Sequence, residues 1–188
     1  MWENHSLAEQ EAEDFIAFVW HYYCRNILKP SKGACSMSTK TAVVKNLQGV
    51  TFAAKADSNH WVMMDGPESI GGTDAGSRPK ELLLMALGGC TGSDVASILT
   101  KKRVPLKGFE IHLRANVSEE HPQVFTDIHI EYVFTGDDID PAAVERAIEL
   151  STTKYCSVSA MLRASVTITH SYHILPESKD IAVIAQAL

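Results

Sequence analysis

Two cysteines in this 188-residue chain stand in settings that could support thiol chemistry. Cys90 lies in an otherwise aliphatic segment and follows Gly88 and Gly89, which would let a backbone or a ligand come close. Cys156 precedes the short predicted helix SVSAML, where unpaired N–H groups and the helix dipole favour a thiolate, and Lys154 would add to this effect. The same local features fit two unrelated buried cysteines, so the residues alone leave both interpretations open.

The other two cysteines have ordinary surroundings. Cys24 lies in an aromatic segment, and Cys35 lies in a predicted loop next to Gly33. Buried cysteines mostly behave as small hydrophobic side chains, so we interpret both as structural or incidental. The sequence has no CxxC pair, no Cys/His cluster with zinc spacing and no HExxH motif, so we expect no metal and no cofactor.

The composition is that of an ordinary soluble globular protein, with 45% hydrophobic and 21% charged residues. A formal net charge of −6 argues against nucleic acid as a partner, because phosphate binding needs a clustered cationic surface. No uninterrupted apolar run reaches about 18 residues, so no membrane span is expected. Four widely spaced cysteines do not make a disulfide-stabilised secreted scaffold, and we expect the protein to be cytoplasmic.

The chain is expected to divide into an N-terminal helical extension, residues 1–36, and a domain, residues 37–188. The extension begins acidic and continues with aromatic residues, which predicts one amphipathic helix that ends at the Lys29–Pro30 step. Its acidic start is unlike a signal peptide. The segment MSTKTAVVKN then begins at Met37 like the start of a domain.

The domain opens with alternating residues that predict three short strands between residues 39 and 65, followed by a loop rich in Gly, Pro and Ser. A long helix is predicted from Pro79 to about Lys102. Its run LLLMAL is apolar on every side, which predicts a helix buried all round. Pro79 suits a first helical turn, where its missing N–H would be unpaired anyway.

Apolar and polar residues alternate again in the second half of the domain. GFEIHLRANV and TDIHIEYVFTG read as two strands. Asp140 and Pro141 then begin a second helix as N-cap and first residue, a short helix follows Cys156, and SVTITHSYHI forms a last strand. The predicted order is βββ-α-ββ-αα-β, which defines an α+β domain.

Two motifs resemble those of the OsmC/Ohr family. RPKELLLMALGGCTGSDVASILTKKR is similar to the family's central helix, in which a Pro-x-Glu-Leu-Leu start leads to a cysteine preceded by small residues. KYCSVSAML is similar to the second motif, which places the second cysteine ahead of a short helix. The two cysteines are 66 positions apart, with two strands and a helix between them, as in the family. The resemblance covers about Met37 to Ile174.

The resemblance implies an OsmC-like fold and an intertwined homodimer, with the long helices buried at its centre and two active sites between the subunits. It implies that Cys90 attacks an organic or lipid hydroperoxide and that Cys156 resolves the resulting sulfenic acid as a disulfide. A dithiol reductant would then restore both thiols by exchange. No metal or organic cofactor is required, and the apolar LLLMAL wall would favour organic hydroperoxides over hydrogen peroxide.

The sequence departs from the better-known branches at the position of an arginine. Those branches use an arginine from the N-terminal strands, together with a glutamate at the helix start, to stabilise the thiolate. This chain has no arginine between Met37 and Ser77. The candidate cations are Arg78, at the start of the helix, and Lys40 and Lys55 in the strands.

The second departure concerns carboxylates. The family glutamate commonly lies ten residues before the first cysteine, where this chain has Lys80, and Glu81 follows it. Glu81 is therefore the predicted active-site glutamate, with the alignment shifted by one. Asp94 lies one helical turn after Cys90 and would disfavour a thiolate there, so we expect it to cap or pair elsewhere.

A second function fits the same motifs. The missing arginine favours a non-enzymatic OsmC-like dimer that binds a ligand or senses redox state, keeping the fold and an apolar pocket without efficient turnover. A purely structural protein whose cysteines never pair is a further alternative. A hydrolase is disfavoured, because the sequence has no GxSxG motif. Fast reaction with an organic hydroperoxide would distinguish the reductase from these alternatives.

Overall fold

The computed structural model describes residues 38–177. The predicted N-terminal helix, Cys24 and Cys35 lie outside the described residues. The boundary expected between residues 36 and 37 therefore stays a prediction.

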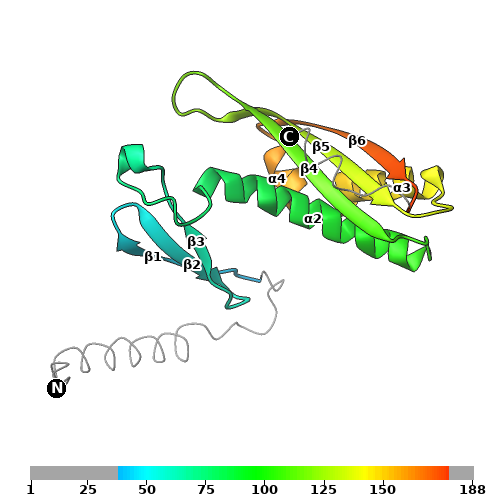
Figure 1. The fold of residues 1–188 in the computed structure, drawn as a ribbon, viewed down its shortest axis with the longest axis horizontal. Helices are drawn as coiled ribbons and strands as arrows, with labels where there is room; N and C mark the ends of the chain where they lie inside the picture. The colour runs from blue at the N-terminus through cyan, green and yellow to red at the C-terminus, as the bar shows by residue number, and fades with distance from the viewer. Residues whose placement is uncertain (1–37, 178–188) are drawn as a thin grey trace, which may run out of the picture. The chain divides into compact units, whose positions relative to one another are not determined.

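The first three strands form an antiparallel sheet in the order β1-β2-β3 (Figure 1). They are β1 (Ala42–Gln48), β2 (Thr51–Ala56) and β3 (Val62–Met64). The turn between β1 and β2 contains Gly49 at a φ of 54°, a left-handed conformation that glycine adopts without steric cost. The predicted meander of three short strands is confirmed.

The glycine-rich loop after β3 is organised around the buried carboxylate of Asp65. This carboxylate accepts hydrogen bonds from the backbone N–H groups of Gly66 (2.7 Å), Thr73 (3.0 Å) and Ala75 (3.0 Å), and from the Thr73 hydroxyl (2.8 Å). The N–H of Ala75, followed by the other donors, holds the pKa of Asp65 well below its ordinary value of 3.8 despite burial. One side chain therefore fixes a loop that the sequence predicted only as irregular.

The loop ends at α2 (Pro79–Lys101), in agreement with the predicted helix. By length and composition α2 could cross a bilayer, with a mean hydropathy of 1.6. Its packing against β4, α3 and α4 accounts for that composition, and these contacts identify it as the central helix of the domain (Figure 1). Within one chain its burial is one-sided, since Leu87 and Val95 are buried while Met85 is 55% exposed. The apolar run LLLMAL had predicted that this helix is buried on every side.

A second sheet has the order β4-β5-β6 and is formed by β4 (Gly108–Val117), β5 (Phe125–Thr135) and β6 (Thr167–Leu175). The β4–β5 pair is antiparallel, and the β5–β6 pair is parallel. A parallel pair needs a crossover connection, which α3 (Pro141–Leu150) and α4 (Ser157–Leu162) supply. The order βββ-α-ββ-αα-β and the α+β class are therefore confirmed.

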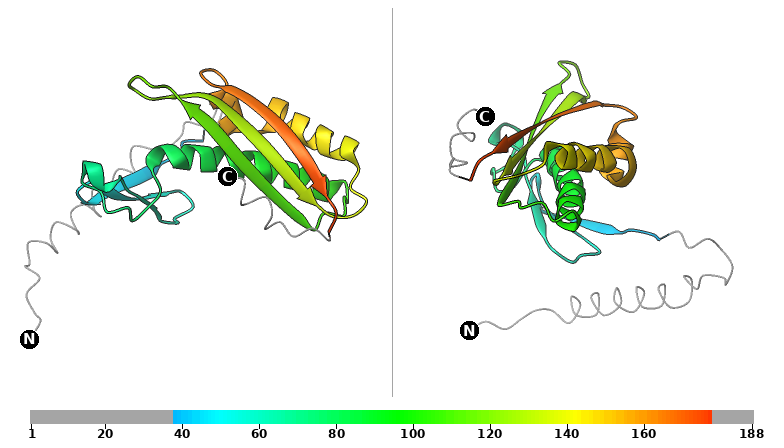
Figure 2. Two further views of the ribbon diagram at one scale, coloured as in Figure 1. Left: turned by 45° about the horizontal axis from the view of Figure 1, so that its top comes forward. Right: turned by 90° about the vertical axis from the view of Figure 1, so that its right-hand side faces the viewer.

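The core lies between this second sheet and the helices, which cover one of its faces (Figure 2). The alternating apolar residues of β4 pack against this core. The buried core side chains come mainly from α2, β5 and α3: Leu87, Val95, Leu99, Ile128, Tyr132, Phe134, Val144 and Ala147.

Two glycines let β4 approach α2 closely. A Cβ at Gly88 would lie 2.7 Å from Leu113 Cδ1, and one at Gly92 would lie 2.6 Å from Ile111 Cδ1, both too close for real Cβ contacts. The close packing predicted for the glycine pair is thus confirmed at Gly88. At Gly89 a Cβ would meet nothing within 4 Å.

We predict that Asp65→Asn lowers the free energy of unfolding, because an amide cannot reproduce a charged acceptor of four hydrogen bonds. The folded-state pKa of Asp65 is depressed, so its contribution is fully present above the unfolded value near 3.8 and is lost as pH falls through the folded value. Urea unfolding should therefore show a large difference between wild type and variant near neutral pH. An equal difference at neutral and strongly acidic pH would contradict the charge-based account.

Candidate active site

The two motif cysteines lie side by side although they are far apart in the sequence. Cys90 comes from the middle of α2, and Cys156 is the N-cap residue of α4. The two Sγ atoms and a carboxylate oxygen of Asp94 all lie within 4.8 Å of one another. Both cysteines are free thiols. A disulfide needs sulfur atoms about 2 Å apart, so a small movement would join them.

A π-helical turn, η2 (Ser151–Tyr155), positions Cys156. The turn continues directly from α3, whose predicted cap is confirmed because Asp140 accepts the N–H of Ala142 at 3.0 Å. The N–H of Cys156 donates to the Ser151 carbonyl at 2.9 Å, which closes the wider turn. Such turns recur at functional sites because they reorient the residues that follow. Here the turn brings both Ser151 and Cys156 to α2.

The surroundings of Cys156 keep its thiol protonated. Its side chain is 3% exposed, and this burial raises the pKa of the thiol from 9.0 to about 11. The N–H of Ser159 donates to Sγ at 3.3 Å and opposes the shift, whereas Cys90 and Asp94 reinforce it. Lys154 places its Nζ 5.4 Å from the centre of the Tyr155 ring. The prediction that the helix start favours a thiolate at Cys156 is therefore wrong, because burial outweighs one backbone hydrogen bond.

A buried chain of hydroxyl groups leads to the carboxylate beside the thiols. Tyr132 Oη lies 2.8 Å from Thr91 Oγ1, which lies 2.9 Å from Ser151 Oγ. Ser151 Oγ in turn donates to Asp94 Oδ2 at 3.1 Å. A carboxylate can only accept hydrogen bonds, so the Ser151 hydroxyl donates to Asp94. Thr91 then donates to Ser151, and Tyr132 donates to Thr91. All the hydrogen bonds of this chain therefore point toward Asp94.

Asp94 pairs with Ser151, in agreement with the expectation that it pairs elsewhere than with Cys90, and it is nevertheless part of the site. Its partner, Ser151, lies inside the site, and its carboxylate lies beside both sulfur atoms. The helical spacing had indicated this proximity. Neither Ser151 nor Tyr132 belongs to a recognisable motif, and Thr91 was present in the first motif without a distinguishing signal.

The structure does not bring the other two predicted site residues to the thiols within one chain. Arg78 lies twelve residues before Cys90, which corresponds to about 18 Å along the axis of α2. Its guanidinium pairs with Asp74 at 2.6 Å. Its backbone N–H donates to Glu81 Oε2 at 2.9 Å, and this hydrogen bond caps the helix. The roles of Arg78 and Glu81 toward Cys90 stay a prediction, and a second chain would be needed to supply them.

Other cations near these elements have contacts of their own. Lys55 donates to Asn59 Oδ1 at 2.8 Å, within the first sheet. Arg163, which follows α4, donates to the carbonyl oxygens of Thr152 and Ser159. Arg163 therefore fastens α4 to the π-helical turn and stabilises the backbone that carries Cys156.

A cavity of about 360 Å³ adjoins the carboxylate of Asp94. It would give a small molecule access to the polar side of the site. Two lysines stand among its lining residues, which come from the second half of α2 and from the α3–η2 segment: Asp94, Ser97, Ile98, Lys101, Lys102, Leu150 and Tyr155.

Cys90, Asp94 and Cys156 are also the residues that could hold a soft metal ion, since two thiolates and a carboxylate are ligands that Zn²⁺ accepts. Metal binding requires deprotonated thiols. The raised pKa of Cys156 counts against it.

Comparison with known proteins identifies the family. The family model of OsmC-like protein matches residues 72–171, a range that contains both cysteine motifs. Protein YhfA of Escherichia coli K12 is 43% identical over 134 residues, which cover 71% of this chain and 97% of YhfA. The chain therefore belongs to the OsmC family, as its motifs predicted.

Solved structures confirm the OsmC fold. A hypothetical protein from Aquifex aeolicus VF5 is 34% identical, with a TM-score of 0.66 over 76% of this chain and 100% of that one. The organic hydroperoxide resistance protein OsmC from Legionella pneumophila has a TM-score of 0.56 over 73% of this chain and 98% of that one. It is only 13% identical, so this likeness shows a shared fold alone.

Proposed function

We propose that this protein is a thiol-dependent reductase of organic hydroperoxides that acts in defence against oxidative stress. One observation carries the proposal: two thiols that are 66 positions apart lie within 4.8 Å of each other. Membership of the OsmC family and the fold shared with hydroperoxide resistance proteins support it. A peroxidatic and a resolving thiol must meet in this way to form a disulfide.

The burial of the two thiols supports a different role for each. Cys90 is half-buried and Cys156 is buried, so a peroxide reaches Cys90 more readily. Cys90 would become a sulfenic acid as the hydroperoxide is reduced to an alcohol. Cys156 would then displace water from that sulfenic acid and form a disulfide. An external dithiol would return both residues to thiols, and a reducing compartment such as the cytoplasm would supply it.

One observation favours the alternative of a redox-sensing dimer. The raised pKa of Cys156 slows any step that needs its thiolate. The absence of arginine between Met37 and Ser77 acts in the same direction. A sensor would still form the disulfide, but slowly and without rapid turnover. The rate of hydroperoxide consumption separates the two functions.

The test compares cumene hydroperoxide consumption, with dithiothreitol as reductant, by wild type, Cys90→Ser and Cys156→Ser. Wild type should turn over far faster than the dithiol alone, and Cys90→Ser should fall to that background. Cys156→Ser should complete one turnover and accumulate a sulfenic acid that dimedone captures. Arg146→Ala, an exposed change on α3, is the matched control and should keep full activity. A wild-type rate equal to background would reject the reductase.

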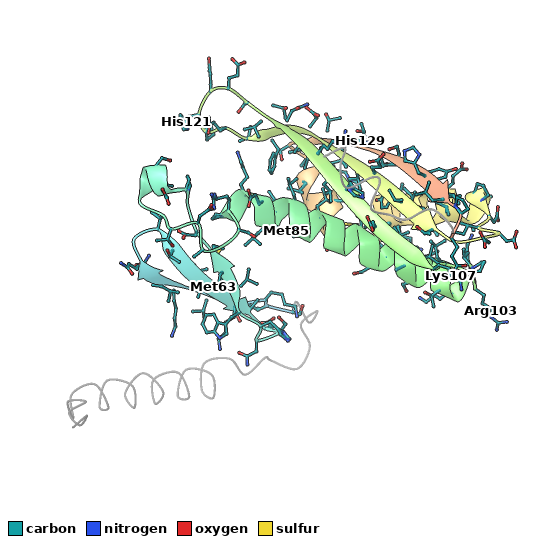
Figure 3. All side chains as sticks on the ribbon, in the orientation of Figure 1. Met63, Met85, Arg103, Lys107, His121 and His129 are labelled. Carbon is teal, nitrogen blue, oxygen red and sulfur yellow. The ribbon has the colours of Figure 1, made fainter. Side chains whose placement is uncertain are left out.

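We further propose that the protein works as a homodimer. Single chains rarely expose large contiguous apolar patches unless a partner covers them. Here apolar side chains are exposed on the first sheet and on α2: Val43, Val44, Leu47, Trp61, Val62, Met63, Leu83 and Met85 (Figure 3 labels Met63 and Met85). A shallow groove of about 580 Å³ also follows Met85, Gly89 and Ala96 along α2. A second copy of α2 packed there would complete the burial that its apolar run predicts.

We predict that Met85→Glu converts the dimer to a monomer, because it places a charge in the centre of this apolar surface. Light scattering coupled to size-exclusion chromatography should give twice the chain mass for wild type and a single chain mass for the variant. Arg146→Glu introduces the same side chain at an exposed position of α3 and should leave the dimer intact. A monomeric wild type, or a dimeric Met85→Glu, would contradict the proposed interface.

A further inference from the structure

Asp94 holds a position from which it can exchange protons with both thiols. A carboxylate oxygen lies within 4.8 Å of Cys90 Sγ and of Cys156 Sγ. Ser151 engages Oδ2 at 3.1 Å, and the second carboxylate oxygen has lone pairs of its own. Asp94 also lines a cavity of about 360 Å³. The carboxylate is therefore held in one orientation between the reacting groups and the solvent.

The chemistry of a two-cysteine reductase needs a proton carrier at this position. In each step a thiol loses a proton and a departing oxygen gains one. The departing group is an alkoxide in the first step and a hydroxide in the second. Burial keeps the Cys156 proton in place, with a pKa of about 11, so a free thiolate is scarce near neutral pH. A group that takes the proton from sulfur during attack and passes it to oxygen serves both steps.

We propose, on the basis of the reductase function above, that Asp94 is the catalytic residue that shuttles these protons. In the first step Asp94 takes the proton of Cys90 as its sulfur attacks the terminal peroxide oxygen. The S–O bond forms, the O–O bond breaks, and Asp94 gives the proton to the departing alkoxide. Sulfur is oxidised by two electrons, and the peroxide is reduced to an alcohol.

The second step uses the same carboxylate. Asp94 takes the proton of Cys156 as that sulfur attacks the Cys90 sulfenic acid. The S–S bond forms, the S–O bond breaks, and the departing hydroxide receives the proton and leaves as water. Asp94 ends each step as the carboxylate with which it began, so no proton is gained or lost overall.

The buried hydroxyl chain gives this shuttle its orientation. Within residues 38–177, Thr91 and Ser151 make no hydrogen bond to either sulfur, so they act as positioning residues through Asp94. Tyr132 begins the chain, and burial raises its pKa, so it remains a donor. The titratable groups that face the carboxylate are Cys90 on α2, Cys156 before α4 and Tyr132 on β5, together with Lys101, Lys102 and Tyr155, which line the cavity beside it.

If Asp94 acted only through its negative charge, its removal would change the reaction rate in the opposite direction. A fixed negative charge beside a thiol disfavours the thiolate, so its removal should speed any reaction limited by thiolate. If Asp94 is a proton shuttle, its removal slows every step in which a thiol must lose its proton, and it slows most the steps whose leaving group also needs a proton. The leaving group therefore distinguishes the two roles.

The experiment measures single-turnover rates of Asp94→Asn and wild type with two reagents. Cumene hydroperoxide has a leaving oxygen that must be protonated. Dithiobis-nitrobenzoate modifies Cys90, and attack by Cys156 then expels an aryl thiolate that needs no proton. Asp94→Asn should react with the hydroperoxide about 100-fold more slowly or worse, while its release of aryl thiolate, whose leaving group needs no proton, should slow far less. Asp94→Glu should recover part of the hydroperoxide rate, and Arg146→Ala, an exposed change on α3 outside this cavity, should match wild type.

The pH profile gives a second readout. Wild type should depend weakly on pH near neutrality, because the thiol and the carboxylate react together. Asp94→Asn should speed up about tenfold per pH unit, because only the thiolate then reacts. An Asp94→Asn rate with hydroperoxide equal to or above wild type would overturn the shuttle and leave the reductase intact. Equal slowing with both reagents would also overturn it, and wild-type activity at background would overturn both proposals.

Discussion

The contact between the middle of α2 and the turn after α3 is the interaction on which the site depends. It consists of the buried hydrogen bond between Thr91 and Ser151, with Tyr132 on one side and Asp94 on the other. Leaving a buried hydroxyl unpaired costs about 1–3 kcal/mol, so these residues hold each other in a single arrangement. This contact joins the helix that carries Cys90 to the turn that precedes Cys156, so it brings the two cysteines into one place. Without it Cys156 would have no fixed position relative to Cys90.

The electrostatics of the site follow from the same contact. Apolar burial and a carboxylate surround the two thiols, and both raise the pKa of Cys156. The better-known branches of the family stabilise the thiolate with an arginine from the N-terminal strands. This chain has no arginine between Met37 and Ser77. A site that keeps the proton on Cys156 requires a base that acts during the reaction. Asp94, at the end of the directed hydroxyl chain, has the position for that role.

Local signals predicted much of the fold, and long-range contacts explain what they missed. The caps at Pro79 and Asp140 and the alternation of β4 depend on neighbouring residues, and the structure confirms them. The π-helical turn and the four hydrogen bonds to Asp65 join residues whose proximity exists only in the folded chain. The pKa of Cys156 was mispredicted for the same reason, because a helix start is visible in a sequence and burial is not. The two cysteines were identified by their motifs, whereas their hydroxyl partners carry no motif.

The central claim is that Cys90 and Cys156 form one reactive pair within a chain, and disulfide mapping tests it most directly. Reduced protein would be treated with one equivalent of cumene hydroperoxide, blocked, digested and examined by mass spectrometry. The account predicts one dominant linked peptide that joins Cys90 to Cys156, with no chain-to-chain link on a non-reducing gel. Cys90 oxidised to a sulfinic acid beside a free Cys156 thiol, or bridged to Cys24 or Cys35, would contradict it.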